Sequence, residues 1–380
     1  MMKKLFSVVL TCMPLAAVAA AGTATVQVPL QVKANLFSPT TMDFSANGEQ
    51  VCIAGADHTE MGTRGGRLIL VDRVHGTLSW QKTFPLPEHY ASIAPIQCRI
   101  VDNRVYLLAN MITHLSPSLG QTLTYLYIFD AQGRQVAREE LSSPARDQVA
   151  YAMDVSKDAV QVAGYLMDQD EDFEYYSTFT QSLDRSLKPL SAPVVRKTGA
   201  YAPFPGARIV GDSLYIGGVF VPAKVGKRDA WSDDFAASRM RLTRGYAWSA
   251  HSKFGTHSDT RAGVAEDGTV YALQHGAGRT SLLAVPPGGS PLPVVTYASS
   301  YCDTDAVLGY GTYVLALRAP CDGKARKAVL KIDPATGHET VLSGAIGEPV
   351  EIATKGALWS AVAKGKDGRL YFHSAWSGTQ

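Results

Sequence analysis

The feature that most constrains the fold of this chain is a repeat with a period near fifty residues. Seven times, a short strand-like segment leads into a turn rich in Gly, Asn or Asp and then into a second, apolar β-rich segment. Such a pattern predicts a β-hairpin. The turns centre near Asn47, Asp102, Lys157, Gly211, Asp267, Tyr310 and Lys355. Successive turns are 43 to 56 residues apart in the sequence, a length that suits one four-stranded sheet per repeat.

A second pair of strand-like segments follows the hairpin in most repeats. The first, second and sixth repeats carry it over residues 67–84, 124–141 and 328–343. In each pair, Asp opens the turn, where its side chain can cap backbone N–H groups, and Gly closes it, where a positive φ is needed. These residues are Asp72 with Gly76, Asp130 with Gly133, and Asp333 with Gly337. Each repeat therefore predicts one antiparallel sheet of four strands.

The two ends of the chain complement each other. The last repeat ends with the segment 369–376 and lacks a fourth strand, whereas residues 25–33 alternate apolar and polar side chains before the first hairpin. We expect 25–33 to complete the last sheet, which would close a ring and remove an exposed edge. The prediction is an all-β, seven-bladed β-propeller in a single domain over residues 22–380, with six or eight blades as alternatives. Two β-sandwiches would not produce so even a period.

Two segments carry a motif of known propeller repeats. Residues 70–80 and 330–338 each contain an Asp-x-x-x-Gly turn, and Trp80 ends the first of them. These segments resemble the repeats of quinoprotein-like and related periplasmic propellers, in which a tryptophan docks between blades. The resemblance implies a propeller architecture over most of the chain. We predict no quinone cofactor, however, because the tryptophan does not recur in the other repeats and the sequence lacks the vicinal cysteine pair of quinone dehydrogenases.

Residues 1–21 are typical of a secretory signal peptide. Lys3 and Lys4 precede an apolar segment at 5–15, and small residues suited to cleavage follow at 17–21. The apolar segment is short for a membrane span and contains Pro14, which argues against an anchor. Lipid attachment at Cys12 stays an alternative, although residues 9–11 lack the usual small side chains. We expect a periplasmic or secreted protein without a transmembrane segment in its mature chain.

Four cysteines follow the signal segment, an even number suited to an oxidising compartment. Cys302 and Cys321 flank the predicted hairpin centred at 309–311, so we expect them to lie opposite each other and to form a disulfide. Elimination then pairs Cys52 with Cys98. Four buried thiols are the alternative.

The charge balance excludes several kinds of partner. The chain has 36 Lys and Arg against 34 Asp and Glu, and two of the lysines lie in the signal segment. A formally neutral mature chain has no basic surplus with which to bind nucleic acid or an anionic membrane non-specifically.

Phosphate-binding glycine loops, HExxH zinc motifs and GxSxG elbows are absent from the sequence. We expect a monomer.

The loops between the second and third strands of the first four repeats are long. The loop at 165–176 alternates carboxylates with aromatic residues, and its candidate binding residues are Asp168, Asp170, Asp172, Phe173 and Tyr175. Such a loop could hold Ca²⁺, dock a basic partner or simply be a solvated surface. The neighbouring loop at 224–234 begins with basic residues and contains Trp231, so it could pair with the acidic loop or anchor an interface.

A second candidate site lies where inner strands begin at the mouth of the predicted channel. His257, Asp259, Asp303 and Asp305 come from adjacent repeats and could bind a metal or act as general acid and base. The alternative interpretation is that they line a water-filled channel or cap strand ends.

The function that these features predict is an exported binding or scaffold module. It would engage a protein or another extracellular ligand through the long loops of blades 1–4. The alternative is a periplasmic hydrolase or lyase with its site at the channel mouth. Propellers host both kinds of function, so the architecture alone does not decide between them.

Overall fold

The computed structural model describes most of the chain between residues 22 and 376. The described residues are 22–28, 37–47, 49–59, 62–72, 75, 77–113, 121–141, 145–202, 205–227, 235–243, 246–252, 260–310, 312–323, 328–341, 348–355, 358–364 and 370–376. Within these ranges every regular element is a β-strand, as the repeat predicts. They contain no helix that could cross a membrane. The predicted signal segment 1–21 lies outside the described residues.

The strands of the described residues form seven separate antiparallel sheets. The first contains β2 (Phe37–Phe44), β3 (Gln50–Thr59), β4 (Gly62–Asp72) and β5 (Thr77–Pro85). The second contains β6 (Tyr90–Val101), β7 (Arg104–Thr113), β8 (Thr122–Phe129) and β9 (Gln135–Leu141). The third contains β10 (Asp147–Val155), β11 (Val160–Gln169), β12 (Phe173–Leu183) and β13 (Val194–Arg196), with β17 (Lys224–Gly226) also paired to β12.

The fourth sheet departs from the regular pattern. It contains β14 (Ala200–Tyr201), β15 (Gly206–Val210), β16 (Ser213–Val221), β18 (Phe235–Arg241) and β19 (Tyr246–Ser252). Two short strands, β14 and β15, share the inner edge of β16 in place of one long strand. The chain breaks its pairing near Pro205, which has no N–H group to donate to a ladder.

The fifth and sixth sheets return to four strands in sequence order. The fifth contains β20 (Arg261–Val264), β21 (Val270–Gly276), β22 (Arg279–Val285) and β23 (Val295–Ala298). The sixth contains β24 (Tyr301–Tyr310), β25 (Tyr313–Pro320), β26 (Ala328–Ile332) and β27 (Glu339–Val341).

The last sheet joins both ends of the described chain. It contains β28 (Glu348–Lys355), β29 (Leu358–Lys364) and β30 (Leu370–Trp376), and its fourth strand is β1 (Gly22–Val28). β1 runs antiparallel to β30, from the pair Gly22 and Trp376 to the pair Val28 and Leu370. The predicted strand at 25–33 is confirmed over residues 25–28 and begins three residues earlier than predicted, while residues 29–33 lie outside the described residues.

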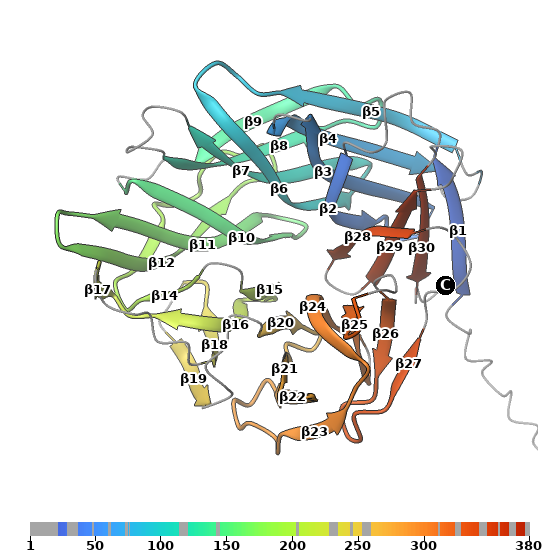
Figure 1. Ribbon diagram of the computed structural model, residues 1–380. Coiled ribbons are helices and arrows are strands. Elements are labelled where there is room, and N and C mark those ends of the chain that lie inside the picture. The colour runs from blue at the N-terminus through green and yellow to red at the C-terminus, as the bar shows by residue number, and fades with distance from the viewer. Residues whose placement is uncertain are drawn as a thin grey trace, which may run out of the picture.

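The sheets follow one another around a common centre, with their first strands innermost (Figure 1). The apolar core lies between neighbouring sheets. Cys52 and Leu70 of the first sheet share one cluster with Leu107 and Phe129 of the second. Further clusters join the second sheet to the third, the third to the fourth, the fourth to the fifth and the fifth to the sixth. At the centre, a Cβ atom on Gly263 of β20 would collide with the carbonyl oxygen of Val307 in β24, so glycine permits this close approach.

Two aromatic side chains of outer strands dock on the Asp–Gly turn of the next sheet. Trp80 of β5 donates from Nε1 to the carbonyl oxygen of Ala131 at 3.1 Å. Its ring covers Gly133, whose φ of 75° and lack of a Cβ atom suit this contact. Tyr297 of β23 lies against the turn at Gly337 in the same way. The sequence motif identified the tryptophan, but it missed the tyrosine that takes the equivalent place between the fifth and sixth sheets.

Both predicted disulfides are confirmed. Cys52 of β3 bonds to Cys98 of β6, and the bond joins the first sheet to the second. Both of these residues are completely buried. Cys302 of β24 bonds to Cys321, which follows β25.

Candidate functional site

A cavity of about 820 Å³ lies between the innermost strands, at the centre of the ring of sheets. Strands β6, β10, β15, β20 and β24 supply most of its wall. The charged side chains that line it are Arg99, Arg208, Arg261 and Asp305. The cavity therefore offers a ligand both an apolar wall of inner-strand side chains and a few charged groups.

Three of the inner strands carry a charged residue at the same position of the repeat. Arg99, Asp154 and Arg208 each stand three residues before the centre of their hairpin turn. Arg99 Nη2 and Asp154 Oδ1 form an ion pair at 2.5 Å, and Arg208 Nη2 lies 3.7 Å from Glu266 of the fifth sheet. The sequence pattern could have revealed these residues, because they align when the repeats are superimposed on their turns.

Arg208 is the least well satisfied of these groups. Its Nη1 atom is buried and makes no hydrogen bond to any residue in the described part of the chain. Burial, followed by the positive charge of Arg99, lowers the pKa of Arg208 to about 10. The guanidinium therefore keeps its charge at neutral pH, and its Nη1 atom has no hydrogen-bond partner among the described residues.

The four residues predicted at the channel mouth are placed only in part. Asp305 lines the central cavity. Asp303, two residues earlier, does not line it, and its charge acts instead on His275 and Arg318 of the disulfide region. The pairing of β24 with β25 shifts register between Thr304 and Ala306, which interrupts the regular alternation of faces. His257 and Asp259 lie outside the described residues.

The predicted acidic loop proves to be mostly strand. β11 continues to Gln169 and β12 begins at Phe173, so only three residues form the turn between them. Strand β17 of the neighbouring basic segment pairs with β12, from Phe173 with Gly226 to Tyr175 with Lys224. We call residues 168–176 and 223–227 together the rim arm. The two segments pair through their backbones, whereas the pairing of their charges stays a prediction, and the expectation of a long irregular loop is wrong.

Asp170 fixes the turn of the rim arm. Its Oδ1 atom accepts hydrogen bonds from the backbone N–H groups of Asp172 and Phe173 at 2.9 and 2.8 Å, and Tyr175 donates its hydroxyl to Oδ2 at 2.6 Å. The hydroxyl of Tyr175, then the N–H of Phe173, lowers the pKa of Asp170, and the same contact raises the pKa of Tyr175. The ammonium group of Lys224 lies 3.6 Å from the centre of the Phe173 ring. The turn is thus held by its own side chains.

The remaining predicted binding residues of the rim arm face solvent. Asp168 and Asp172 are exposed, and Tyr175 is 37% exposed. Trp231 lies outside the described residues. Calcium binding by this segment stays a prediction. Among the described residues, the one cluster of three side chains with metal-ligating atoms close together is His275, Cys302 and Cys321, and both of its sulfur atoms are engaged in the disulfide.

Comparison with known proteins gives a likeness of fold. No family model and no curated protein matches the sequence. An acylaminoacyl peptidase solved in complex with Z-Gly-Gly-Phe-chloromethyl ketone has a TM-score of 0.50 at 8% identity over 87% of this chain. This chain spans only 50% of that peptidase.

Two further solved structures resemble the chain with lower scores. The β-propeller domain of the trilobed protease from Pyrococcus furiosus has a TM-score of 0.44 at 12% identity, over 80% of this chain and 84% of that one. TolB from Acinetobacter baumannii has a TM-score of 0.39 at 14% identity, over 88% and 83%. With successive four-stranded sheets around a centre and a core between neighbouring sheets, the chain is an all-β protein of the propeller type.

Proposed function

We propose that the chain is an exported, seven-bladed β-propeller that acts as a binding module, with the rim arm as its docking surface for a basic segment of another exported protein. Seven sheets among the described residues support the blade number. The pairing of β1 with β30 supports a ring closed by the two ends of the chain. The two disulfides support an oxidising compartment.

The observation that carries the binding role is the joining of two sheets in the rim arm. In the sequence β17 lies between β16 and β18 of the fourth sheet, but it pairs with β12 of the third. The backbone N–H of Lys227 also donates to the carbonyl oxygen of Asp172 at 2.9 Å. A partner would therefore meet a surface that is already ordered, and binding would cost little further conformational entropy.

The charges of the rim arm favour a basic partner. Asp168, Glu171 and Asp172 are exposed on the arm beside the exposed ring of Tyr175. Carboxylates at the edge of an interface steer a positively charged partner and set its orientation, and a partly exposed aromatic ring supplies contact area. The two lysines of the arm are also exposed, and both contact the acidic turn: Lys224 lies over the ring of Phe173, and the ammonium group of Lys227 donates to the carbonyl oxygen of Asp170.

Charge reversal tests this docking surface. The variant Asp168→Lys/Asp172→Lys should recover at least roughly tenfold less partner than the wild type when the tagged protein is purified from the exported fraction of its own host, because like charges would face each other. The matched control is Glu49→Lys/Asp158→Lys, which also reverses two exposed carboxylates. These residues lie on the β2–β3 and β10–β11 turns, and the β10–β11 turn is at the end of β11 that is farther from the rim arm. Equal recovery by all three proteins, measured by quantitative mass spectrometry, would refute the rim arm as a docking surface.

The central cavity supports a second candidate, a hydrolase or lyase with its site in the channel. The favouring observation is that Asp305 and the incompletely bonded guanidinium of Arg208 line one cavity. A small anionic or polar molecule would satisfy the buried N–H of Arg208. Native mass spectrometry of the protein from its own host separates the two proposals. A bound small molecule that is lost in Asp305→Ala favours the cavity, whereas an unliganded chain in both proteins argues against it.

A further inference from the structure

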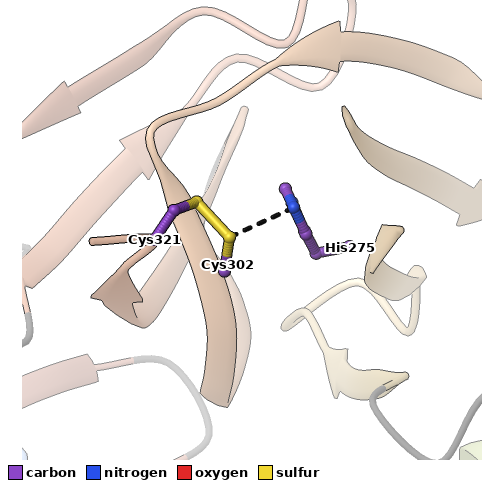
Figure 2. Close-up of side chains that lie close together, drawn as sticks. All are labelled: His275, Cys302 and Cys321. Carbon is purple, nitrogen blue, oxygen red and sulfur yellow. Dashed lines mark hydrogen bonds between the residues drawn. A yellow bond between two sulfur atoms is a disulfide. The ribbon is translucent and has the colours of Figure 1, made fainter. Parts of the chain in front are cut away.

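A histidine touches the Cys302–Cys321 disulfide at the edge of the sixth sheet. His275 of β21 places its Nε2 atom 3.2 Å from Sγ of Cys302 (Figure 2). The two residues come from neighbouring sheets, 27 positions apart in the sequence. Cys302 is partly buried and Cys321 is exposed. The bond therefore joins an exposed cysteine to a partly buried one that lies beside an imidazole.

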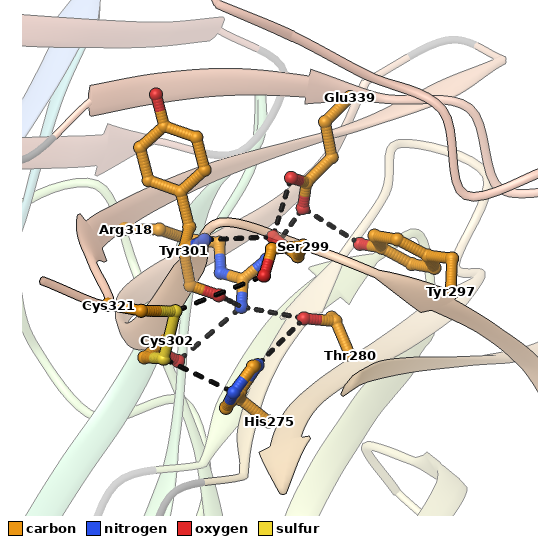
Figure 3. A network of polar contacts seen from close by, with 9 residues as sticks. All are labelled: His275, Thr280, Tyr297, Ser299, Tyr301, Cys302, Arg318, Cys321 and Glu339. Atoms are coloured by element: carbon orange, nitrogen blue, oxygen red, sulfur yellow. Dashed lines mark hydrogen bonds and ion pairs between the residues drawn. A yellow bond between two sulfur atoms is a disulfide. The ribbon is translucent and has the colours of Figure 1, made fainter. Parts of the chain in front are cut away.

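The surrounding hydrogen bonds accommodate the tautomer of this imidazole that has its proton on Nε2. Arg318 donates from Nη2 to Oγ1 of Thr280 at 2.9 Å, and that oxygen lies 3.1 Å from Nδ1 of His275 (Figure 3). Since Thr280 accepts from Arg318, its own hydrogen can point at Nδ1. In the tautomer with the proton on Nε2, Nδ1 accepts from Thr280 and the ring N–H is directed at Cys302, and this is the tautomer that the proposal below uses.

A buried ion pair holds this arrangement in place. Arg318 is completely buried and donates from Nη1 to Oε1 of Glu339 at 2.6 Å. Tyr297 donates its hydroxyl to the same carboxylate at 3.1 Å. The charged groups facing His275 are Arg318, Asp303 and Glu339. Burial, followed by the charge of Arg318, lowers the pKa of His275, so the imidazole is neutral at neutral pH and keeps its single N–H.

The exposed sulfur lies beside an open hollow. Sγ of Cys321 is 3.9 Å from the carbonyl oxygen of Ser299, and Ser299 lines a hollow of about 540 Å³ between the fifth and sixth sheets. Tyr301, His338 and Glu339 also line it. A peptide segment seated there could bring a thiol to Cys321.

We propose that Cys302–Cys321 is a redox-active disulfide, reduced by a dithiol of an exported protein or peptide, with His275 as the group that stabilises the departing Cys302 thiolate. A thiolate of the dithiol attacks Sγ of Cys321. A new bond forms to that sulfur, the Cys302–Cys321 bond breaks, and its electron pair remains on Sγ of Cys302, which accepts a hydrogen bond from Nε2–H of His275.

The second half of the exchange completes the electron balance. The other thiol of the dithiol loses its proton to water and attacks its partner sulfur in the mixed disulfide. The dithiol becomes a disulfide, and Cys321 leaves as a thiolate. Both protein thiolates then take up protons from water. Two electrons and two protons pass in total from the dithiol to this protein.

The other disulfide of the chain provides an internal reference. Cys52 and Cys98 are both completely buried, and Sγ of Cys98 lies near the carbonyl oxygen of Cys52 rather than near an imidazole. Neither sulfur of that bond can be reached by an external thiolate without opening of the structure. One chain thus contains one disulfide suited to exchange and one suited to a structural role.

Reduction by dithiothreitol tests the proposal on the full chain. Alkylation and peptide mass spectrometry at pH 7.5 should show Cys302–Cys321 reduced at least roughly tenfold faster than Cys52–Cys98. His275→Leu should slow reduction of Cys302–Cys321 by about tenfold, the effect of losing one hydrogen bond to a charged atom. His275→Gln, whose amide also donates, should recover part of the rate. The control is His338→Leu, which removes a histidine that lines the neighbouring hollow.

A thiol titration separates a chemical role of His275 from a purely structural one. In Cys321→Ser, the rate of Cys302 alkylation as a function of pH should give a thiol pKa below its ordinary value of about 8.5. Adding His275→Leu should raise that pKa. The proposal is overturned if the two disulfides are reduced at equal rates, or if neither the reduction rate nor the thiol pKa changes when His275 is replaced in a folded protein.

Discussion

The double variant Cys52→Ala/Cys98→Ala is expected to lose about 4 kcal/mol of unfolding free energy, the chain-entropy value for a loop of this length. The two cysteines are 46 residues apart, and their bond joins the first sheet to the second. Both side chains also belong to the buried apolar cluster between those sheets, so the variant loses packing contacts as well as the covalent bond. Urea unfolding followed by tryptophan fluorescence and circular dichroism measures the change.

The second disulfide supplies the comparison for this result. Cys302 and Cys321 are 19 residues apart, and the same entropy argument gives about 3 kcal/mol for Cys302→Ala/Cys321→Ala. The longer, buried bond should therefore be the more stabilising of the two. A loss of less than about 1 kcal/mol for the Cys52 and Cys98 variant would contradict its structural role.

Arg318→Leu is expected to destabilise the protein by about 3–5 kcal/mol, the cost of breaking one side of a buried ion pair. The guanidinium donates to Glu339, Ser299 and Thr280, and its removal leaves the Glu339 carboxylate with only the neutral hydroxyls of Tyr297 and Ser299 as donors. The double variant Arg318→Leu/Glu339→Gln should recover part of the loss, because it no longer leaves a carboxylate unpaired.

A surface arginine provides the matched control for Arg318. Arg134 forms an ion pair with Asp130 at 2.7 Å, but its side chain is 79% exposed. Arg134→Leu should leave the urea midpoint unchanged, since exposed pairs contribute little. The account fails if Arg318→Leu and Arg134→Leu unfold at the same urea concentration.

Local sequence signals predicted the repeats because each blade begins with a hairpin whose turn has a recognisable composition. Asp102 and Gly211 stand at such turns with positive φ, and Gly133 and Gly337 close the outer turns with φ near 75°. Cysteine parity and the position of one hairpin sufficed for both disulfides. These signals are local, so no knowledge of the neighbouring sheets was needed.

The remaining features depend on contacts between sheets, and sequence patterns did not reveal them. Arg318 occupies an ordinary strand position in the sequence, yet it is completely buried because Glu339 and Thr280 converge on it from other strands. The pairing of β17 with β12 crosses from one sheet to the next. His275 meets Cys302 only because β21 and β24 belong to neighbouring sheets. Residue order along one strand contains no signal for such contacts.

Site-specific photo-crosslinking tests the binding role of the rim arm most directly. A photoreactive phenylalanine analogue would replace Asp172 on the arm or, as the matched position, Asp158 at the other end of β11. After irradiation of host cells that produce the protein, we predict a covalent adduct with a partner protein from position 172 and none from position 158. No adduct from 172, or the same adducts from both positions, would contradict the proposal that this propeller binds its partner through the rim arm.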